Sequence, residues 1–266
     1  DAQRPSRGKL NLSLSVCMRR FEYGWIQSLS WDMDMLSLIA GIYRANGKEE
    51  VLLSQSPAIL DSLVELAKVQ STEASNAIEG IVTTSTRLRQ LVADKTTPRN
   101  RDEQEIMGYR DALNVIHESY DSISLCRNHI LQLHKILYNY QFNARGGQLK
   151  SVQNYISATY PDGWTEVLFT PLAPYETAEA LDQICAEYNR VVGNGEVEPL
   201  LAIPIFIHDF LCIHPFNDGN GRMSRLLTTL LLYRSGFMVG KYVSLEAKIA
   251  RHKDMYYAAL RESSDI

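Results

Sequence analysis

The sequence lacks an excess of positive charge, a dense cysteine pattern and any long apolar run. Its formal net charge of -4 argues against a general nucleic-acid-binding protein, which normally presents a basic face. Its four cysteines form no CxxC pair, so we expect reduced thiols rather than a disulfide framework. No apolar run approaches the roughly 20 residues that span a bilayer, so we expect no membrane segment.

The composition is that of a soluble globular protein, with 45% hydrophobic and 22% charged residues in a chain of 266. This length suffices for one large domain, or for a main domain with a smaller partner. The first ten residues contain no apolar core of a secretory signal. We therefore expect a cytoplasmic protein.

Apolar residues recur three and four positions apart through most of the chain, which predicts helices. The expected helices cover residues 34–45, 56–79, 102–120, 125–140, 174–189, 198–213, 221–234 and 245–262. Asp102 is expected to cap the third of these, with Glu105 reaching back to it. Two extended segments around the turn at 161–163 predict a β-hairpin, and LNLSLSV at 10–16 alternates like a short strand. The fold class is therefore all-α with one hairpin.

The segment HPFNDGNGRMSR, residues 214–225, combines features that suit phosphate binding. Gly219, Asn220 and Gly221 tolerate positive φ, so their backbone N–H groups can converge on one anion. This nest leads into a helix N-terminus, where free amides and the helix dipole also favour anions. Arg222 and Arg225 lie three positions apart on one helix face, and guanidinium groups match phosphate oxygens. The segment can therefore hold several phosphates.

Two further side chains of this segment suit transfer chemistry. Asp218 offers a carboxylate beside the nest, and Mg²⁺ typically takes one or two protein carboxylates together with substrate phosphates. His214 can take a proton at neutral pH because its ordinary pKa is about 6.5. Each feature alone is common in turns and helix ends, and His208, His214 and Asp218 fit no common zinc spacing. Their joint occurrence in order favours transfer from a nucleoside triphosphate to a hydroxyl.

This segment matches the motif HxFx(D/E)GNGRxxR at every specified position, so the chain resembles the Fic family of proteins. The resemblance implies that His214 is the general base and that Asp218 binds Mg²⁺. It also implies that Gly219, Asn220, Gly221 and Arg222 cradle the phosphates of ATP, and that Arg225 meets the γ-phosphate. The implied organisation is an N-terminal region over residues 1–100 and a Fic catalytic core over 101–266.

A second motif, S-x-x-x-E-G, lies at residues 75–80, within the expected helix. Ser75 and Glu79 share one helix face because they lie four positions apart. On their own, a Ser and a Glu on a helix are usually solvated. Within a Fic-like chain, Ser75, Glu79 and Gly80 resemble the end of the inhibitory helix, expected here at about 57–79. The resemblance implies that Glu79 pairs with Arg225 and holds the enzyme inactive.

The expected hairpin, at about 151–169, is similar to the flap against which Fic proteins align the target side chain. Its nucleotide-facing part is expected at Ile156, Ser157, Ala158 and Thr159. Tyr256 and Tyr257 could form a wall for the adenine, although helix core is an equally good interpretation. Lys150 stands where an Arg is common in the family.

The function we expect is a protein adenylyltransferase that moves AMP from MgATP to a Ser, Thr or Tyr hydroxyl. ATP and Mg²⁺ are the expected cofactors, and an unknown target protein is expected to dock at the flap. The alternatives are a Fic relative acting as a phosphotransferase or de-AMPylase, and a regulatory or toxin-like binding module. The target, the signal that relieves inhibition and the oligomeric state, with a homodimer as one option, stay open.

Overall fold

The computed structural model describes residues 21–53, 57–142, 146–159 and 162–264, and the expected strand at 10–16 lies outside them. In the described part, ten α-helices and one two-stranded sheet are present, which confirms the all-α class with one hairpin. The helices are α1 (Met33–Leu53), α2 (Pro57–Ile78), α3 (Ser85–Val92), α4 (Arg101–Ser119), α5 (Arg127–Leu137), α6 (Pro174–Gly193), α7 (Pro199–Ile213), α8 (Asn220–Arg234), α9 (Leu245–Arg251) and α10 (Lys253–Ser264). None of these described helices is long and apolar enough to cross a membrane.

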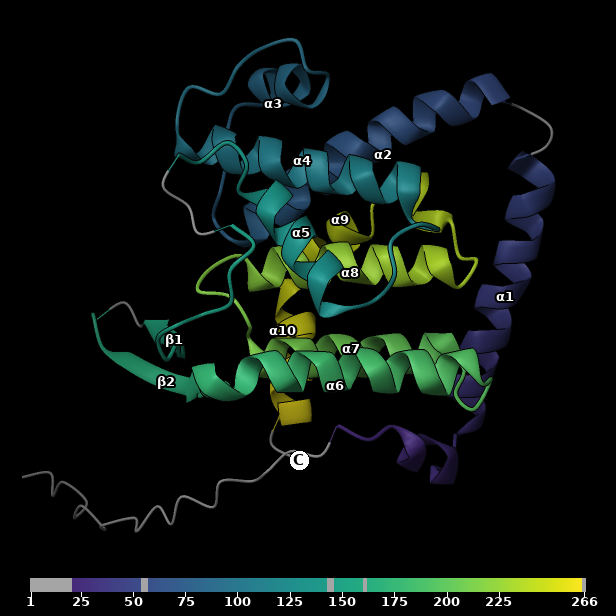
Figure 1. The fold of residues 1–266 in the computed structure, drawn as a ribbon. Coiled ribbons are helices and arrows are strands. Elements are labelled where there is room, and N and C mark those ends of the chain that lie inside the picture. Colours follow the sequence, from purple (N-terminus) through teal and green to yellow (C-terminus); the bar gives the residue numbers. More distant parts are fainter. Residues whose placement is uncertain (1–20, 54–56, 143–145, 160–161, 265–266) are drawn as a thin grey trace, which may run out of the picture.

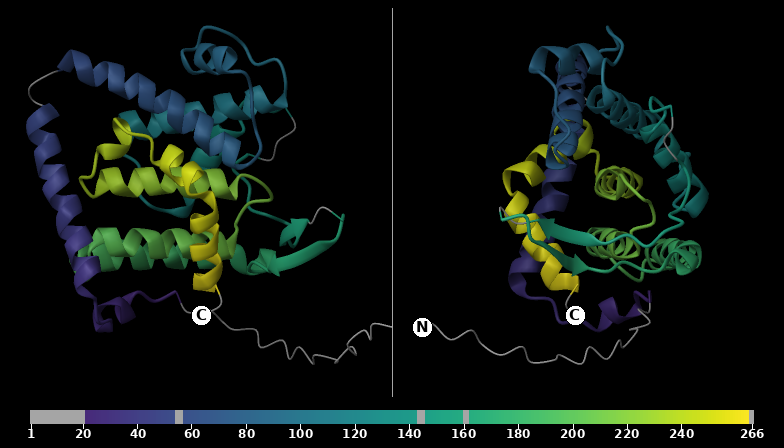
Figure 2. Two further views of the ribbon diagram at one scale, coloured as in Figure 1. Left: turned by 180° about the vertical axis from the view of Figure 1, so that it is seen from behind. Right: turned by 90° about the vertical axis from the view of Figure 1, so that its left-hand side faces the viewer.

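Helix α8 is the central element of the fold. It lies between the antiparallel pair α6 and α7 on one side and the pair α4 and α5 on the other, and it packs against both α7 and α4 (Figure 1). Helix α2 packs along α4 and α9, and α10 crosses the ends of α7 and α9 (Figure 2). The loop that precedes α8 therefore lies where the N-terminal helices, the core helices and the last helix meet.

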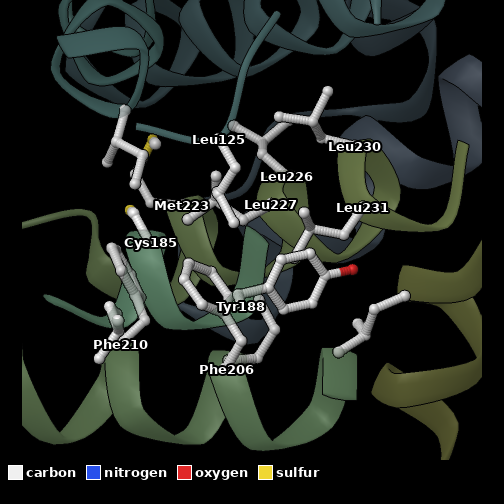
Figure 3. Packing of buried hydrophobic residues seen from close by; sticks show 14 of the residues in the cluster. Leu125, Cys185, Tyr188, Phe206, Phe210, Met223, Leu226, Leu227, Leu230 and Leu231 are labelled. Atoms are coloured by element: carbon white, nitrogen blue, oxygen red, sulfur yellow. The ribbon is translucent and has the colours of Figure 1, made fainter. Parts of the chain in front are cut away.

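The central position of α8 follows from its apolar side chains, which point in several directions. Met223, Leu226 and Leu227 are fully buried, and Leu230 and Leu231 are 1% exposed. They pack against aromatic side chains of α6 and α7 (Figure 3). Close packing of this kind leaves a helix few alternative positions, so the N-terminus of α8 is held in place.

The start of α4 corrects one expectation. Asn100, not Asp102, is the N-cap residue, and its side chain accepts a hydrogen bond from the backbone N–H of Glu103 at 2.9 Å. Asp102 lies in the first turn instead, where its charge still suits the helix dipole. Both Asn and Asp are good caps, so the composition alone could not choose between residues two positions apart.

The helix expected at 245–262 is two helices. They are separated at His252, whose φ of -120° and ψ of 34° are not helical. The apolar period continues across this residue, so the periodicity gave no sign of the break. The change of direction lets α10 reach the end of α7.

The hairpin consists of β1 (Ile156–Thr159) and β2 (Thr165–Phe169), which pair antiparallel. The register joins Ser157 to Val167 and Thr159 to Thr165, with an irregularity after Ile156. The strands therefore occupy only the later part of the expected range 151–169. Before β1, Asn154 instead contacts the segment before α8, as described below.

Candidate active site

A pocket of about 620 Å³ opens between α8, the end of α7, the hairpin and α10. Of the expected site residues, it brings together His214, Gly221, Arg225, Glu79, Ile156, Ser157 and Tyr256. Asp218, Gly219, Asn220, Arg222 and Ser75 do not line it, and Ala158 and Thr159 continue the strand β1 beyond its lining residues.

His214 is the C-cap residue of α7 and has a left-handed backbone, with φ of 50° and ψ of 62°. Its Nδ1 lies 3.3 Å from the carbonyl oxygen of Leu211. Because a carbonyl only accepts, Nδ1 carries the proton and Nε2 is the basic atom of the neutral ring. Burial lowers the pKa of His214 to about 4, so the ring is neutral at pH 7. The side chain is therefore in the state that can accept a proton.

The strained backbone around His214 is held by donors from one segment, Lys150 to Asn154. The buried ammonium of Lys150 donates to the carbonyl of Ile213 at 2.9 Å, and its backbone N–H donates to Pro215 at 2.8 Å. The amide of Asn154 donates to His214 at 3.3 Å and to Phe216 at 3.0 Å. Burial lowers the pKa of Lys150 to about 8.

Lys150 and Asn154 are functional residues that sequence reasoning missed. Lys150 stood out only as a departure from the family's Arg, and Asn154 did not stand out. The signal that could have found them is a Lys and an Asn four positions apart, just before a predicted flap.

The loop 217–219 turns directly into α8. Gly219 has φ of 82°, and a Cβ there would come within 2.9 Å of the Tyr138 hydroxyl, so glycine is required. Asn220 closes the turn by accepting from Phe216 N at 3.0 Å and donating to Phe216 O at 2.8 Å. Gly219 and Asn220 thus shape the loop, and the first amides of α8 have no intrahelical partner.

Arg225 and Glu79 form the ion pair that the sequence predicted. Arg225 Nη2 donates to Glu79 Oε1 at 2.7 Å, while its Nε and Nη2 donate to the hydroxyl and carbonyl of Ser75 at 2.8 and 2.9 Å. Arg225 is 3% exposed and Ser75 is fully buried. A Cβ on Gly221 would collide with Glu79 Oε1, so the carboxylate lies directly against the first turn of α8. Glu79 therefore occupies the anion-binding end of that helix.

Gly80 explains how α2 delivers Glu79 to this position. Glu79 follows the last residue of α2, and Gly80 has φ of 79°. Gly80 N donates to Ala77 O and Ile81 N donates to Asn76 O, both at 3.0 Å. This pair of bonds is a Schellman motif, which ends a helix at a left-handed glycine. The chain turns away immediately after Glu79. The Glu79 side chain therefore reaches the pocket directly from the end of α2.

Arg222 and Asp218 lie on the side of the loop that faces α4. Arg222 is 1% exposed, with Nη1 2.8 Å from Glu105 Oε2 and Nη2 donating to Tyr138 at 2.9 Å. Glu105 also accepts from Arg101, whose Nη2 is 3.6 Å from Asp218 Oδ2. The expected phosphate ligand Arg222 is thus buried in an ion-pair chain. Sequence reasoning missed Glu105 and Arg101 in this role because i,i+4 charge pairs are common on helices.

Apolar and aromatic side chains also line the pocket. They include Ile156 of β1 and Leu168 and Phe169 of β2, next to Ser157. Tyr256 and Tyr257 also line it, with ring centroids 5.5 Å apart at an angle of 75°. Burial raises the pKa of Tyr256. This apolar and aromatic lining can accept a flat ring.

Three buried histidines predict a loss of stability in mild acid. Burial lowers the pKa values of His117, His134 and His214 from 6.5 to about 4. Below pH 6.5 the unfolded chain therefore binds protons that the folded chain does not, so stability is full above that pH and falls toward pH 4. Between pH 7 and pH 5 each histidine should cost about 2 kcal/mol of unfolding free energy.

Urea unfolding at pH 7, 6 and 5 checks this expectation, with His117→Asn as the comparison variant. His117 contacts Tyr233 in the core, away from the pocket, so its replacement removes one titrating group without altering the site. The variant should lose about a third less stability than the parent between pH 7 and pH 5. If the unfolding free energy of both proteins fell equally between pH 7 and pH 5, the low pKa of His117 would be contradicted.

Comparison with known proteins identifies the domain. Residues 124–232 match the model of the Fic/DOC family, so this part of the chain is a Fic/DOC domain. Protein adenylyltransferase fic-1 of Caenorhabditis elegans is 28% identical over 142 residues, covering 52% of this chain and 25% of that protein. Protein adenylyltransferase Fic of Nematostella vectensis is 27% identical over 171 residues, covering 61% and 37%. The chain therefore spans less than two thirds of the length of these relatives.

Solved structures show the same fold over a larger share of the chain. A Fic domain containing signaling protein from Bacteroides thetaiotaomicron has a TM-score of 0.69 at 23% identity, covering 82% of this chain and 80% of that one. A Fic family protein from Desulfovibrio desulfuricans has a TM-score of 0.70 at 23% identity, covering 89% and 68%. The helical domain with one hairpin is therefore a Fic fold.

Proposed function

We propose that this chain is a protein adenylyltransferase that transfers AMP from ATP to a Ser, Thr or Tyr hydroxyl of another protein. The observation that carries the proposal is one pocket lined by a neutral His214, by Arg225 at the anion-binding end of α8, and by the aromatic side chain of Tyr256. These three parts suit a proton acceptor, a phosphate chain and a base. The curated relatives named protein adenylyltransferase support this interpretation.

The residues present fit ATP and Mg²⁺. The Glu79 carboxylate already rests where an anion would bind, between Arg225 and Gly221. Arg222 Nε is buried without a hydrogen-bond partner among the described residues, so it retains a free donor. The described part of the chain holds no cluster of three metal-ligating side chains. Asp218 would hold Mg²⁺ together with substrate phosphates, the arrangement that Mg²⁺ favours.

The reaction follows from the positions of these groups. His214 Nε2 takes the proton of the target hydroxyl, whose oxygen attacks the α-phosphorus of ATP. The bond from that phosphorus to the β-phosphate breaks, and pyrophosphate leaves with its charge near Arg225 and the α8 amides. A bound Mg²⁺ supplies additional charge stabilisation on the phosphates. The hairpin aligns the target segment through backbone pairing, so the target docks at β1 and β2.

The resting state in this proposal is autoinhibited by Glu79. Its carboxylate and a terminal phosphate need the same guanidinium of Arg225 and the same helix end, so they compete. Like charge also repels the phosphate chain. ATP would then bind without its phosphates in the productive position until α2 or the Glu79 side chain moves.

Mass spectrometry of the Glu79→Gly protein after incubation with MgATP tests the function. Self-modification, and modified peptides from a lysate, should carry the mass of an adenylyl group and should disappear in the Glu79→Gly/His214→Ala protein. A phosphoryl mass would indicate a phosphotransferase, and loss of AMP from a pre-modified protein would indicate the reverse reaction. Tight ATP binding with no covalent product would favour a regulatory binding module.

Lys253 provides a milder way to weaken the inhibitory contact. Its Nζ donates to the carbonyl of Ile78 at 2.8 Å, directly before Glu79, and so ties α10 to the end of α2. Replacing Lys253 by Met should raise AMP transfer about two- to tenfold, because a hydrogen bond to a charged group is worth about 1.5–3 kcal/mol and this one is partly exposed.

The check on Lys253 is a double-mutant comparison of initial rates. Lys253→Met should activate the parent protein and have no effect when Glu79 is already Gly. Lys248→Met, on the exposed face of α9, is the matched control and should change neither protein. Activation by Lys253→Met in both backgrounds would show that Lys253 does not act through Glu79.

A further inference from the structure

His134 on α5 contacts the loop before α8 from the side away from the pocket. Its ring stacks on Phe216, with centroids 3.6 Å apart and planes within 2°. Its Nε2 lies 3.1 Å from the backbone carbonyl oxygen of Asp218. The side chain is 3% exposed. His134 therefore contacts both Phe216, which anchors the loop, and the backbone of Asp218.

The tautomer of His134 is fixed by a third contact. The backbone N–H of Gly147 donates to Nδ1 at 2.9 Å. Nδ1 is therefore the unprotonated nitrogen, and Nε2 carries the hydrogen that it donates to Asp218. Both ring nitrogens are satisfied, so the ring cannot rotate without losing two hydrogen bonds.

Gly147 reaches His134 because it has no side chain. Its φ is 76°, and a Cβ would lie 3.0 Å from both the Leu131 carbonyl and the Lys135 Cβ of α5. This close approach brings the N–H within range of the ring. The same segment continues to Lys150, whose backbone N–H binds Pro215. Residues 147–150 thus bond to Pro215 at the start of the loop directly, and to Asp218 near its end through His134.

Apart from an interaction of its carboxylate with the Tyr138 hydroxyl, Asp218 has few other contacts that fix it. Its carboxylate is 59% exposed, accepts from its own neighbour Gly219 N at 2.7 Å, and lies 3.6 Å from an exposed Arg101. Exposed ion pairs of this kind contribute little to the position of a side chain. The bond from His134 to the Asp218 carbonyl is therefore a buried restraint on the backbone of this residue.

We propose that His134 is a positioning residue that sets the metal affinity of Asp218 by holding its backbone carbonyl. This inference rests on the proposed role of Asp218 as the Mg²⁺ ligand. His134 does not touch the substrate. It lowers the cost of ordering the carboxylate when a cation binds, so the protein without this bond binds the metal more weakly.

Two substitutions separate the two hydrogen bonds of His134. In His134→Gln the side-chain amide can still donate from the position of Nε2, whereas in His134→Asn the amide reaches only the position of Nδ1. Both variants lose the stacking on Phe216, so they are matched controls for each other. His134→Phe keeps the stacking and loses both hydrogen bonds, and it serves if either polar variant does not fold.

The measurement is Mn²⁺ binding to the Glu79→Gly protein, followed by electron paramagnetic resonance in the presence of a non-hydrolysable ATP analogue. His134→Asn and His134→Phe should weaken Mn²⁺ binding about three- to tenfold, the range of one neutral hydrogen bond. His134→Gln should stay within about threefold of the parent. Binding of the metal-free analogue should be the same in all four proteins.

The outcomes distinguish this inference from the proposed function. Equal Mn²⁺ affinity in His134→Asn, His134→Phe and the parent would overturn it. Equal losses of metal and analogue binding would do so as well, because they would indicate a general disturbance of the loop. A parent that binds the analogue but not Mn²⁺ would instead refute the role of Asp218 itself.

Discussion

Replacing His214 by alanine in the Glu79→Gly protein is expected to lower AMP transfer by roughly 10²–10⁴-fold, the usual contribution of a general base. The reason is the state of the ring: burial holds the pKa of His214 at about 4, and the Leu211 carbonyl keeps the proton on Nδ1. Nε2 is therefore free to accept at neutral pH. Alanine removes this acceptor and leaves the helix end otherwise able to form.

The measurement is the initial rate of AMP incorporation, with thermal unfolding to show that the variant folds. His129→Ala is the control, because His129 is half-buried on α5, does not line the pocket, and bonds to a nearby backbone carbonyl, that of Ser124. It should leave the rate unchanged. ATP affinity should also change little in His214→Ala, because the phosphates bind elsewhere. A His214→Ala protein that keeps more than a tenth of the rate would rule out general-base catalysis by this residue.

The sequence predicted those parts of the site that lie within one continuous segment. In the segment 214–225, His214 and Arg225 face one pocket, and Gly219 has the positive φ that its place in the turn required. The spacing of Ser75 and Glu79 placed both on one helix face, and both contact Arg225. Resemblance to a family supplied the link between the two segments, since they are 150 residues apart.

Contacts between other distant segments could not be read from the sequence. Arg222 looked as available as Arg225, yet it is buried against Glu105 of α4. Whether an arginine faces a pocket or a neighbouring helix depends on how two helices pack, and the charge pattern of either helix does not encode that. The same holds for the donors from Lys150, which act on a loop 63 residues away.

Two glycines connect the inhibitory contact to the binding site. Gly80 ends α2 directly after Glu79, and Gly221 leaves room for the Glu79 carboxylate against α8. A side chain at Gly221 would disturb the carboxylate and a phosphate alike, because both would occupy the same space. In the proposed mechanism, inhibition therefore uses the geometry of the phosphate site itself, and the removal of Glu79 should leave that site intact.

Replacing Glu79 by glycine is accordingly expected to raise AMP transfer by roughly 10- to 100-fold over the parent. The bond that is lost, from Arg225 Nη2 to Glu79 Oε1 at 2.7 Å, is charge-assisted. Such bonds contribute about 1.5–3 kcal/mol, and about 1.4 kcal/mol corresponds to a factor of ten. The Glu79 side chain is 33% exposed, so solvent screening favours the lower half of this range. Arg225 keeps its two bonds to Ser75 and remains in place for a phosphate.

Initial rates of AMP incorporation with labelled ATP measure the effect, and two further variants define its cause. Glu73→Gly places a glycine at an exposed position of the same helix, away from Arg225, and should not activate the protein. Glu79→Gln keeps the length of the side chain but not its charge, and should give an intermediate rate. If Glu73→Gly activates as much as Glu79→Gly, a loosened α2 is the cause rather than a vacated guanidinium. If Glu79→Gly binds ATP and transfers no more AMP than the parent, Glu79 does not inhibit this enzyme.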